Sequence, residues 1–222
     1  MITPRLKAII NNVTCPKIAD IGTDHAYIPI FLTEKKLADK IIATDINEGP
    51  LAVARENINK KGQSEKIETR LGGGLSVINA GEVDEIIIAG MGGILISEIL
   101  DNDIDTAKKS RLVLQPMNAQ YELRKYLLSH GFKIISEDIA VEGFKVYNII
   151  IAESGKMQPF ETDFEYQIPK YLKGHKYFKN LCQKKRREFT KVINGLLNSK
   201  DADEEKLKLY QYWKKELDKY EG

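Results

Sequence analysis

Residues 17–27, Lys-Ile-Ala-Asp-Ile-Gly-Thr-Asp-His-Ala-Tyr, decide the fold of this chain. The apolar run Lys17–Ile21 is typical of a buried strand, and Gly22 follows it at the point where a helical pattern begins. A glycine at the step from strand to helix lets the backbone pass close to a ligand. The stretch therefore predicts the first strand and loop of an α/β domain with room for a nucleotide-like molecule.

The alternation of apolar runs with helical stretches continues along the chain and predicts a mostly parallel sheet of seven strands. The other strands are expected at Ile41–Asp45, Lys66–Arg70, Glu85–Ala89, Leu112–Gln115, Lys133–Asp138 and Val146–Ala152. Helices are expected between them, at Thr3–Asn12, His25–Lys35, Pro50–Lys60 and Ala119–Ser129. Only a turn around Glu142–Gly143 separates the last two strands, so these form a hairpin.

The strand pattern stops at Ser154, which predicts a Rossmann-like domain over residues 1–154 and a helical extension over residues 155–222. Apolar residues at helical spacing in the extension predict two helices joined by a turn within 194–203, as an antiparallel, coiled-coil-like hairpin. The extension has 16 Lys and Arg against 11 Asp and Glu, whereas the first domain has a net charge of −3. Residues 170–191 contain nine basic residues and only Glu188 as an acid, a composition suited to RNA.

The composition excludes several other classes of protein. No apolar run approaches the ~18 residues of a membrane span, and the first twelve residues do not resemble a signal peptide, so a cytoplasmic location is expected. Cys15 and Cys182 lack the spacing of a metal site, which indicates reduced, structural thiols and no bound metal. Nothing in the sequence indicates an obligate protein partner.

Acidic residues at strand ends point to the kind of cofactor. Asp20 precedes the first loop, and Asp45, followed by Ile46, ends the second strand, where an acid can hold both ribose hydroxyls. The first loop has one glycine and carries Asp24 where a dinucleotide site would need further glycines and positive potential, which disfavours NAD. A carboxylate here suits S-adenosylmethionine, whose amino and sulfonium groups are positive. Alternatively, Asp20 and Asp45 only cap the helices that follow them.

Two glycine clusters favour the cofactor over helix capping. Gly72–Gly74 follows the third strand, and residues 90–93, Gly-Met-Gly-Gly, follow the fourth. Ligands of open parallel sheets bind outside the carboxyl ends of the strands, and glycines at three of these ends allow close backbone approach.

Three motifs together resemble the bacterial tRNA (adenine(22)-N(1))-methyltransferase family. They are residues 19–27 (Ala-Asp-Ile-Gly-Thr-Asp-His-Ala-Tyr), residues 88–93 (Ile-Ala-Gly-Met-Gly-Gly) and residues 114–116 (Leu-Gln-Pro). The resemblance covers the whole chain, including the helical extension. It implies a class I methyltransferase fold and transfer of a methyl group from S-adenosylmethionine to N1 of an adenine, at position 22, in tRNA.

The resemblance also implies roles for individual residues. The cofactor would be held by Asp20, Gly22, His25, Asp45, Ile46, Gly72, Gly73, Gly90, Met91 and Gly92. Asp24 is the expected catalytic residue: N1 of adenine attacks the methyl group directly, and a nearby carboxylate orients the exocyclic amine and stabilises the charge that develops on the base. The alternative is that Asp24 caps a helix or organises the loop.

The RNA itself is expected to contact two further sets of residues. Tyr27, Gln115, Pro116 and Tyr147 would lie at the target base, with the two tyrosines stacking on it after it leaves the helix. Lys184, Lys185, Arg186 and Arg187 would track the phosphates. The alternatives are that the tyrosines are buried core residues and that the four basic residues form a solvated helix surface.

Three positions depart from the family pattern, and two other functions stay open. Gly73 stands where related sequences often have an acid, so backbone groups would bind the adenine of the cofactor. Met117 follows Gln115 and Pro116, where the family often has Gln-Pro-Asn. Asn148 follows Tyr147, where an acid is frequent. One alternative function is methyl transfer to a protein or small molecule, and the other is RNA binding without catalysis.

Overall fold

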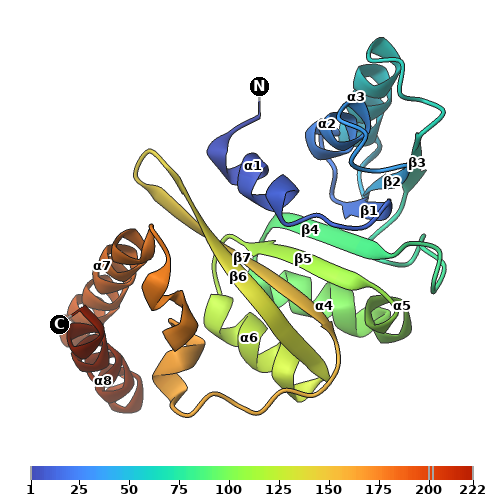
Figure 1. Ribbon diagram of the computed structural model, residues 1–222. Helices are drawn as coiled ribbons and strands as arrows, with labels where there is room; N and C mark the ends of the chain where they lie inside the picture. The colour runs from blue at the N-terminus through green and yellow to red at the C-terminus, as the bar shows by residue number, and fades with distance from the viewer. Residues whose placement is uncertain (1, 200, 202, 222) are drawn as a thin grey trace.

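The computed structural model describes residues 2–199, 201 and 203–221, and its elements follow the predicted alternation (Figure 1). The strands are β1 (Lys17–Ile21), β2 (Lys40–Asp45), β3 (Ile67–Leu71), β4 (Glu85–Met91), β5 (Arg111–Pro116), β6 (Phe132–Glu142) and β7 (Lys145–Ser154). The helices are α1 (Pro4–Asn11), α2 (Tyr27–Glu34), α3 (Glu48–Lys60), α4 (Gly93–Asn102), α5 (Ile104–Lys108), α6 (Gln120–Ser129), α7 (Phe178–Leu197) and α8 (Glu204–Glu221), with 3₁₀ turns η1 (Asp163–Tyr166) and η2 (Lys170–Gly174).

The seven strands form one sheet in the order β3-β2-β1-β4-β5-β7-β6. The first five are parallel, and β7 runs antiparallel to both β5 and β6. Strands β2 and β3 are added on one side of β1, and β4 and β5 are added on its other side. Ligands of such sheets bind at the switch point between β1 and β4 where this order changes. The predicted mostly parallel, seven-stranded Rossmann-like sheet, with its terminal hairpin, is confirmed.

Helices cover both faces of the sheet and bury two apolar layers. Leu6 and Ile9 of α1, together with apolar residues of α2 and α3, pack on one face, while Ile96 of α4 and Leu123 of α6 pack on the other. The strands between them are buried on both sides, which is why they are continuous runs of Ile, Val and Ala rather than alternating ones.

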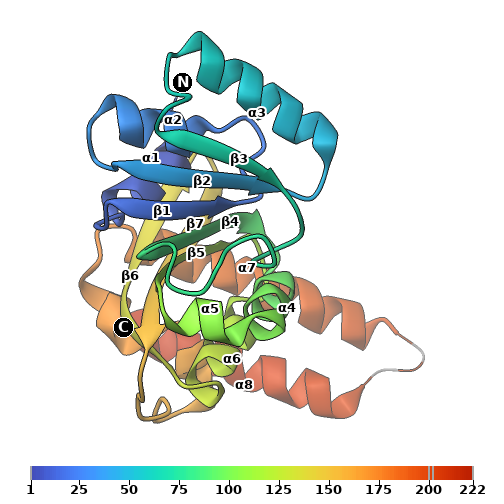
Figure 2. The same ribbon diagram turned by 90° about the vertical axis from the view of Figure 1, so that its right-hand side faces the viewer.

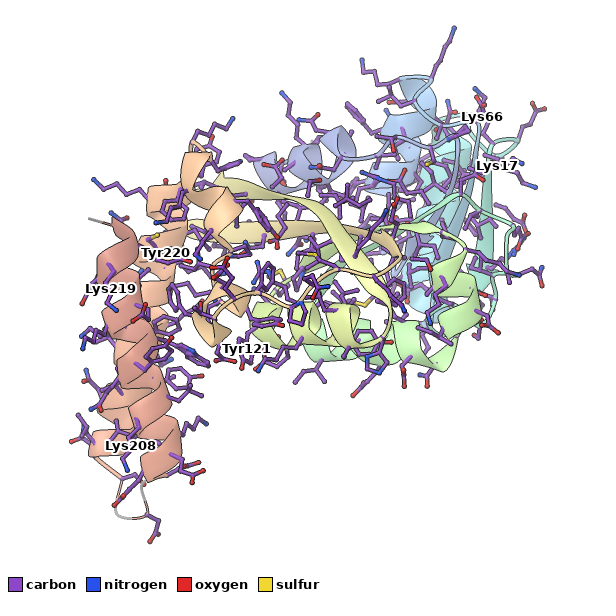
Figure 3. The ribbon with its side chains drawn as sticks, turned by 60° about the horizontal axis from the view of Figure 1, so that its bottom comes forward. Lys17, Lys66, Tyr121, Lys208, Lys219 and Tyr220 are labelled. Atoms are coloured by element: carbon purple, nitrogen blue, oxygen red, sulfur yellow. The ribbon has the colours of Figure 1, made fainter. Side chains whose placement is uncertain are left out.

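The extension is an antiparallel helical hairpin, as predicted, and it packs against the sheet domain (Figures 1 and 2). Its aromatic core, centred on Phe164, Phe189 and Trp213, also includes Ile139 of β6 and Val146 of β7. Tyr121 of α6 lies at the junction (Figure 3), where its ring centroid is 5.2 Å from that of Trp213. The extension thus shares a core with the sheet domain, and division of the chain at residue 154 stays a prediction.

A buried ion pair fixes the segment between β7 and α7. The guanidinium of Arg124 pairs with the carboxylate of Glu137 at 2.6 Å, and neither side chain is exposed to solvent. Arg124 also donates to the carbonyl oxygen of Tyr166, and the Tyr171 hydroxyl donates to Glu137. This network holds η1 and η2 against α6 and β6.

Element boundaries differ from the predicted ones in ways that local chemistry explains. α2 begins at Tyr27 instead of His25, because Asp24 and Ala26 adopt left-handed backbone angles, with φ of 52° and 57°, that a helix cannot contain. β6 and β7 are longer than predicted and extend to the turn. The helix α7 continues to Leu197, so the turn is shorter than the predicted 194–203.

No helix in the described part of the chain is both long and apolar enough to span a bilayer. Cys15 and Cys182 form no disulfide in the described structure, and among the described residues no group of three or more His, Cys, Asp or Glu side chains is placed to bind a metal.

Candidate functional site

A cavity of about 1230 Å³ opens at the carboxyl ends of β1, β2, β3 and β4, where the sequence predicted the cofactor. Of the predicted site residues, those that line it are Asp20, Gly22, Asp24, Tyr27, Asp45, Ile46, Gly72, Gly73, Gly90, Met91 and Tyr147. α1 and the tip of the β6–β7 hairpin add a further wall. The cavity therefore has a sheet end, made by the strand loops, and an α1 end.

Asp20 is a buried carboxylate at the end of β1. It accepts a hydrogen bond of 2.7 Å from the Thr23 hydroxyl, and no basic side chain in the described chain pairs with it. Burial raises the pKa of Asp20 to about 6, and the Thr23 hydrogen bond only partly opposes this shift. Asp20 does not cap α2, whose N-cap is Ala26 without a side-chain hydrogen bond. A buried anion without a cation is suited to a positively charged ligand.

Gly22 has no room for a side chain. Its φ of +73° is left-handed, and a Cβ here would lie 2.3 Å from the terminal methyl of Met91. The N–H groups of Gly22 and Thr23 both donate to the carbonyl oxygen of Thr44, which fixes the first loop to β2. A side chain at Gly22 would therefore have to displace Met91, which also lines the cavity.

The ends of β2 and β3 form the second part of the sheet end. The carboxylate of Asp45 accepts from the N–H of Asn47, the residue before α3, so it orders the loop and does not cap the first turn of the helix. Ile46 is 69% exposed and lines the cavity, and a Cβ on Gly73 would lie 3.3 Å from its Cδ1. This arrangement leaves a flat apolar surface beside glycine backbone, which suits a purine ring.

Asp24 is held at the cavity by a strained loop. Its side chain is 67% exposed, and its carboxylate lies 3.7 Å from Nε2 of His25. It makes no cap to α2. His25 itself does not line the cavity: its ring centroid lies 5.2 Å from that of Tyr27, with the two rings tilted, and its carbonyl oxygen accepts a hydrogen bond from the Asn57 side chain. The first loop thus presents Asp24 and Tyr27 to the cavity, with His25 behind them.

The α1 end contains a residue that sequence reasoning missed. Arg5 of α1 donates 2.8 Å from Nη1 to Oε1 of Gln115, and its guanidinium lies 5.8 Å from the centre of the Tyr147 ring. A Cβ on Gly90 would lie 3.2 Å from Nη1 of Arg5. Arg5 belongs to no strand end and no motif, so only the packing of α1 on the sheet brings it here.

Two residues expected at the target base do not face the cavity. Gln115 and Pro116 are buried, and Gln115 is occupied by Arg5 on one side and the Met117 sulfur on the other. Met117 is 43% exposed and lines the cavity instead. Gly92 serves as the N-cap of α4, with its Cα against Asn118. Tyr147 is largely buried, with one edge at the cavity, whereas Tyr27 is 47% exposed.

The four basic residues at 184–187 do not share one exposed face. Four consecutive residues cover the full circumference of a helix, so one of them must face the core. That residue is Lys185, which donates to the side-chain oxygen of Gln167 and whose pKa is lowered by burial. Lys184 donates to the carbonyl oxygen of Val146, and Arg186 pairs with Asp218, which leaves Arg187 exposed.

Spacing along α7 identifies a set of cations that do share one exposed side of the helix. Lys179, Arg187 and Lys191 are exposed and separated by multiples of four residues, which places them on one side of the helix. None of the three forms an ion pair within the described part of the chain. The helical period, read together with the apolar positions Leu181 and Phe189, would have separated this set from Lys185.

Known proteins are similar to this chain in both sequence and fold. A profile of the methyltransferase domain family matches residues 2–150. The tRNA (adenine(22)-N(1))-methyltransferase of Bacillus subtilis is 41% identical over 139 residues, which is 62% of this chain and 58% of that protein. The aligned stretch thus spans less than two thirds of the Bacillus protein.

Two solved structures match nearly the whole chain. One is a Streptococcus pneumoniae protein, a candidate tRNA (m1A22) methyltransferase, in complex with S-adenosyl-L-methionine; it is 32% identical, with a TM-score of 0.87 and coverage of 99% of both chains. The other is the M. capricolum protein TrmK with S-adenosyl-homocysteine, 26% identical, with a TM-score of 0.82 and coverage of 97% of this chain and 96% of that one. The chain therefore belongs to the methyltransferase domain family and, within it, to the group that includes the tRNA (adenine(22)-N(1))-methyltransferase of Bacillus subtilis.

Proposed function

We propose that this protein transfers a methyl group from S-adenosylmethionine to N1 of an adenine in tRNA, at the position, 22, that its Bacillus relative modifies. The proposal rests on the cavity at the strand ends. It is lined by several glycines and by the buried Asp20, which has no basic partner among the described residues. Relatives solved with S-adenosylmethionine and with its product support the same cofactor here. An enzyme that modifies tRNA would act in the cytoplasm, which is the location we propose for this protein.

The sheet end of the cavity fits the cofactor. Asp20 would attract its ammonium group, Asp45 its ribose hydroxyls, and Ile46 with Gly73 its adenine ring. When bound, S-adenosylmethionine supplies an electrophilic methyl group on a sulfonium. Gly22 and Gly90, at the ends of β1 and β4, both line the cavity, and that methyl group would lie beside their backbone.

The first loop and α1 would receive the target base. The N1 lone pair of adenine forms the new N–C bond as the S–C bond breaks, so the base becomes positively charged and no proton has to be transferred first. Asp24 would orient the exocyclic amine and stabilise this charge, and Tyr27 would stack on the base. Arg5, beside Gly90 and Tyr147, would limit how deeply the base enters.

The protonation of Asp20 predicts a pH dependence of cofactor binding. Because its pKa is about 6 in the free protein, the carboxylate is lost as the pH falls through 6. The affinity for S-adenosylmethionine should be constant above pH 7 and should fall below pH 6, by up to about tenfold per pH unit. Titration calorimetry between pH 5 and 8 measures this.

Matched variants separate Asp20 from other groups in that titration. Asp20→Asn should bind weakly with no pH dependence, and His25→Gln should keep the wild-type profile. Because burial raises the pKa of Asp20 above its unfolded value, its protonation stabilises the folded free protein at low pH, and this contribution is lost as the pH rises through 6. Circular dichroism at each pH checks that the protein is folded, and a fall in cofactor affinity that coincides with loss of the folded protein would contradict the assignment.

The exposed cations of α7 predict the salt dependence of RNA binding. Replacement of Lys179, Arg187 and Lys191 with alanine should weaken tRNA binding and reduce the slope of log affinity against log salt by about 2 to 3, because each phosphate contact releases counterions. Lys66→Ala is the control, since this exposed lysine lies far from the α7–α8 hairpin (Figure 3). An unchanged slope in the triple variant would exclude this face of α7 from RNA binding.

Methylation of tRNA tests the proposal as a whole. Labelled S-adenosylmethionine should transfer its methyl group to an unmodified tRNA transcript and not to the same transcript with guanine at position 22. Cofactor binding with transfer to a protein or small molecule would support the alternative acceptor, and RNA binding without cofactor binding would support the non-enzymatic alternative.

A further inference from the structure

The β6–β7 hairpin is longer than the sheet that carries it. β6 has 11 residues and β7 has 10, whereas the neighbouring β5 has six and pairs only with Ile150–Ala152 of β7. The outer part of the hairpin therefore extends past β5, between α1 on one side and α7 on the other (Figure 1). Its tip reaches the mouth of the cavity, because Glu142 and Lys145 are both lining residues.

The tip presents a single aromatic side chain to solvent. Glu142 pairs with Lys145, so Gly143 and Phe144 form a two-residue turn, with Gly143 at φ +60° as such turns require. Phe144 is 80% exposed, more than any other large apolar residue of the described chain. A two-residue turn leaves the backbone little conformational freedom, so the position from which this ring projects is well defined.

Contacts on both sides of the hairpin hold the tip against the body of the protein. On one side, the N–H of Arg5 donates to the carboxylate of Glu142 at 3.4 Å. On the other, the ammonium of Lys184 donates to the carbonyl oxygen of Val146 at 2.9 Å. Phe144 thus lies between α1, which closes the cavity, and the basic helix α7. Lys145, next to it, is an exposed cation at the rim.

An RNA substrate explains an aromatic ring at this place. N1 of adenine lies on the base-pairing edge, so an adenine whose N1 enters the cavity must leave its stack, and the vacated position costs stacking energy unless another planar group fills it. We propose that Phe144 inserts into the RNA stack at the position that the target adenosine leaves, while Lys145 holds an adjacent phosphate. This inference rests on the proposed function.

The test compares Phe144→Ala with wild type on two full-length tRNAs, one native and one in which the partner of the target adenine is changed so that the adenine is unpaired. On native tRNA, kcat/KM should fall by about 10- to 50-fold, because extrusion is no longer supported. On the unpaired substrate the loss should shrink to about twofold. Phe144→Trp should keep most activity. Leu37→Ala, which removes another exposed apolar side chain, in the connection between α2 and β2, should match wild type on both tRNAs.

Fluorescence gives a second readout that does not depend on turnover. With 2-aminopurine at the target position, wild type should produce a rise in emission on binding, as the base unstacks, and Phe144→Ala should bind but produce less of it. Equal losses on the two tRNAs, or an unchanged rise in emission, would overturn the role of Phe144. If wild type methylates neither tRNA, the proposed function fails instead.

Discussion

Replacement of Asp24 is expected to lower kcat for methyl transfer by about 100- to 1000-fold, which is typical for loss of a preorganised charge at the reacting group. Its carboxylate lines the cavity, and 67% of its side chain is exposed, so it is accessible to a ligand. Within the described part of the chain, the ionisable side chain beside it is His25, whose Nε2 lies 3.7 Å away. The base gains a positive charge as N1 is methylated, and this carboxylate would stabilise that charge.

The choice of variant matters at this position. Asp24 has a left-handed φ of 52°, which asparagine tolerates better than alanine does. Asp24→Asn therefore removes the charge with little strain and is the cleaner test, with Asp39→Ala as an exposed acid at the opposite sheet edge. Single-turnover rates at saturating tRNA measure the effect. Near wild-type rates for Asp24→Asn would exclude a catalytic carboxylate and would leave this residue a role in loop structure.

Replacement of Arg124 with methionine is expected to lower the free energy of unfolding by about 3–5 kcal/mol, because it leaves the Glu137 carboxylate buried without its partner. The melting temperature should fall by about 10 °C in a chain of this size. The double variant Arg124→Met, Glu137→Met should recover much of the loss, since no buried charge is left. Thermal unfolding followed by circular dichroism measures all three proteins.

An exposed ion pair supplies the control for this prediction. Lys133 of β6 and Glu153 of β7 pair at 2.6 Å, but both side chains are at least 40% exposed, so Lys133→Ala should cost less than about 1 kcal/mol. If Arg124→Met proves as mild as Lys133→Ala, the buried network does not hold the extension. Since Arg124 also binds the carbonyl oxygen of Tyr166, its loss should make residues 155–177 more sensitive to protease.

Local sequence signals predicted the sheet and the sheet end of the cavity. Parallel strands end at the same edge of a sheet, so residues at their carboxyl ends lie together. This topology alone brings together Asp20, Asp45 and the glycines at the ends of β3 and β4. The hairpin was predictable for a similar reason, since a turn at Gly143 leaves no room for a crossover helix.

The α1 end of the site depends on tertiary packing and was not predictable in the same way. Arg5 reaches Gln115 across 110 residues of sequence, and no periodic pattern reports such a contact. Lys185 shows the opposite case. Its place in a basic run suggested RNA, yet the helical period that places Phe189 in the core places Lys185 there too. Charge in a sequence shows which residues could bind phosphate, and periodicity decides which of them face solvent.

The most direct test of the account is the identity of the methylated atom. Unmodified tRNA incubated with the protein and S-adenosylmethionine would be digested to nucleosides and separated by chromatography with mass detection, using N1- and N6-methyladenosine as standards. The account predicts N1-methyladenosine from wild type and at most a trace from Asp24→Asn. A methyl group on N6, on another base, or absent from RNA that binds normally would contradict it.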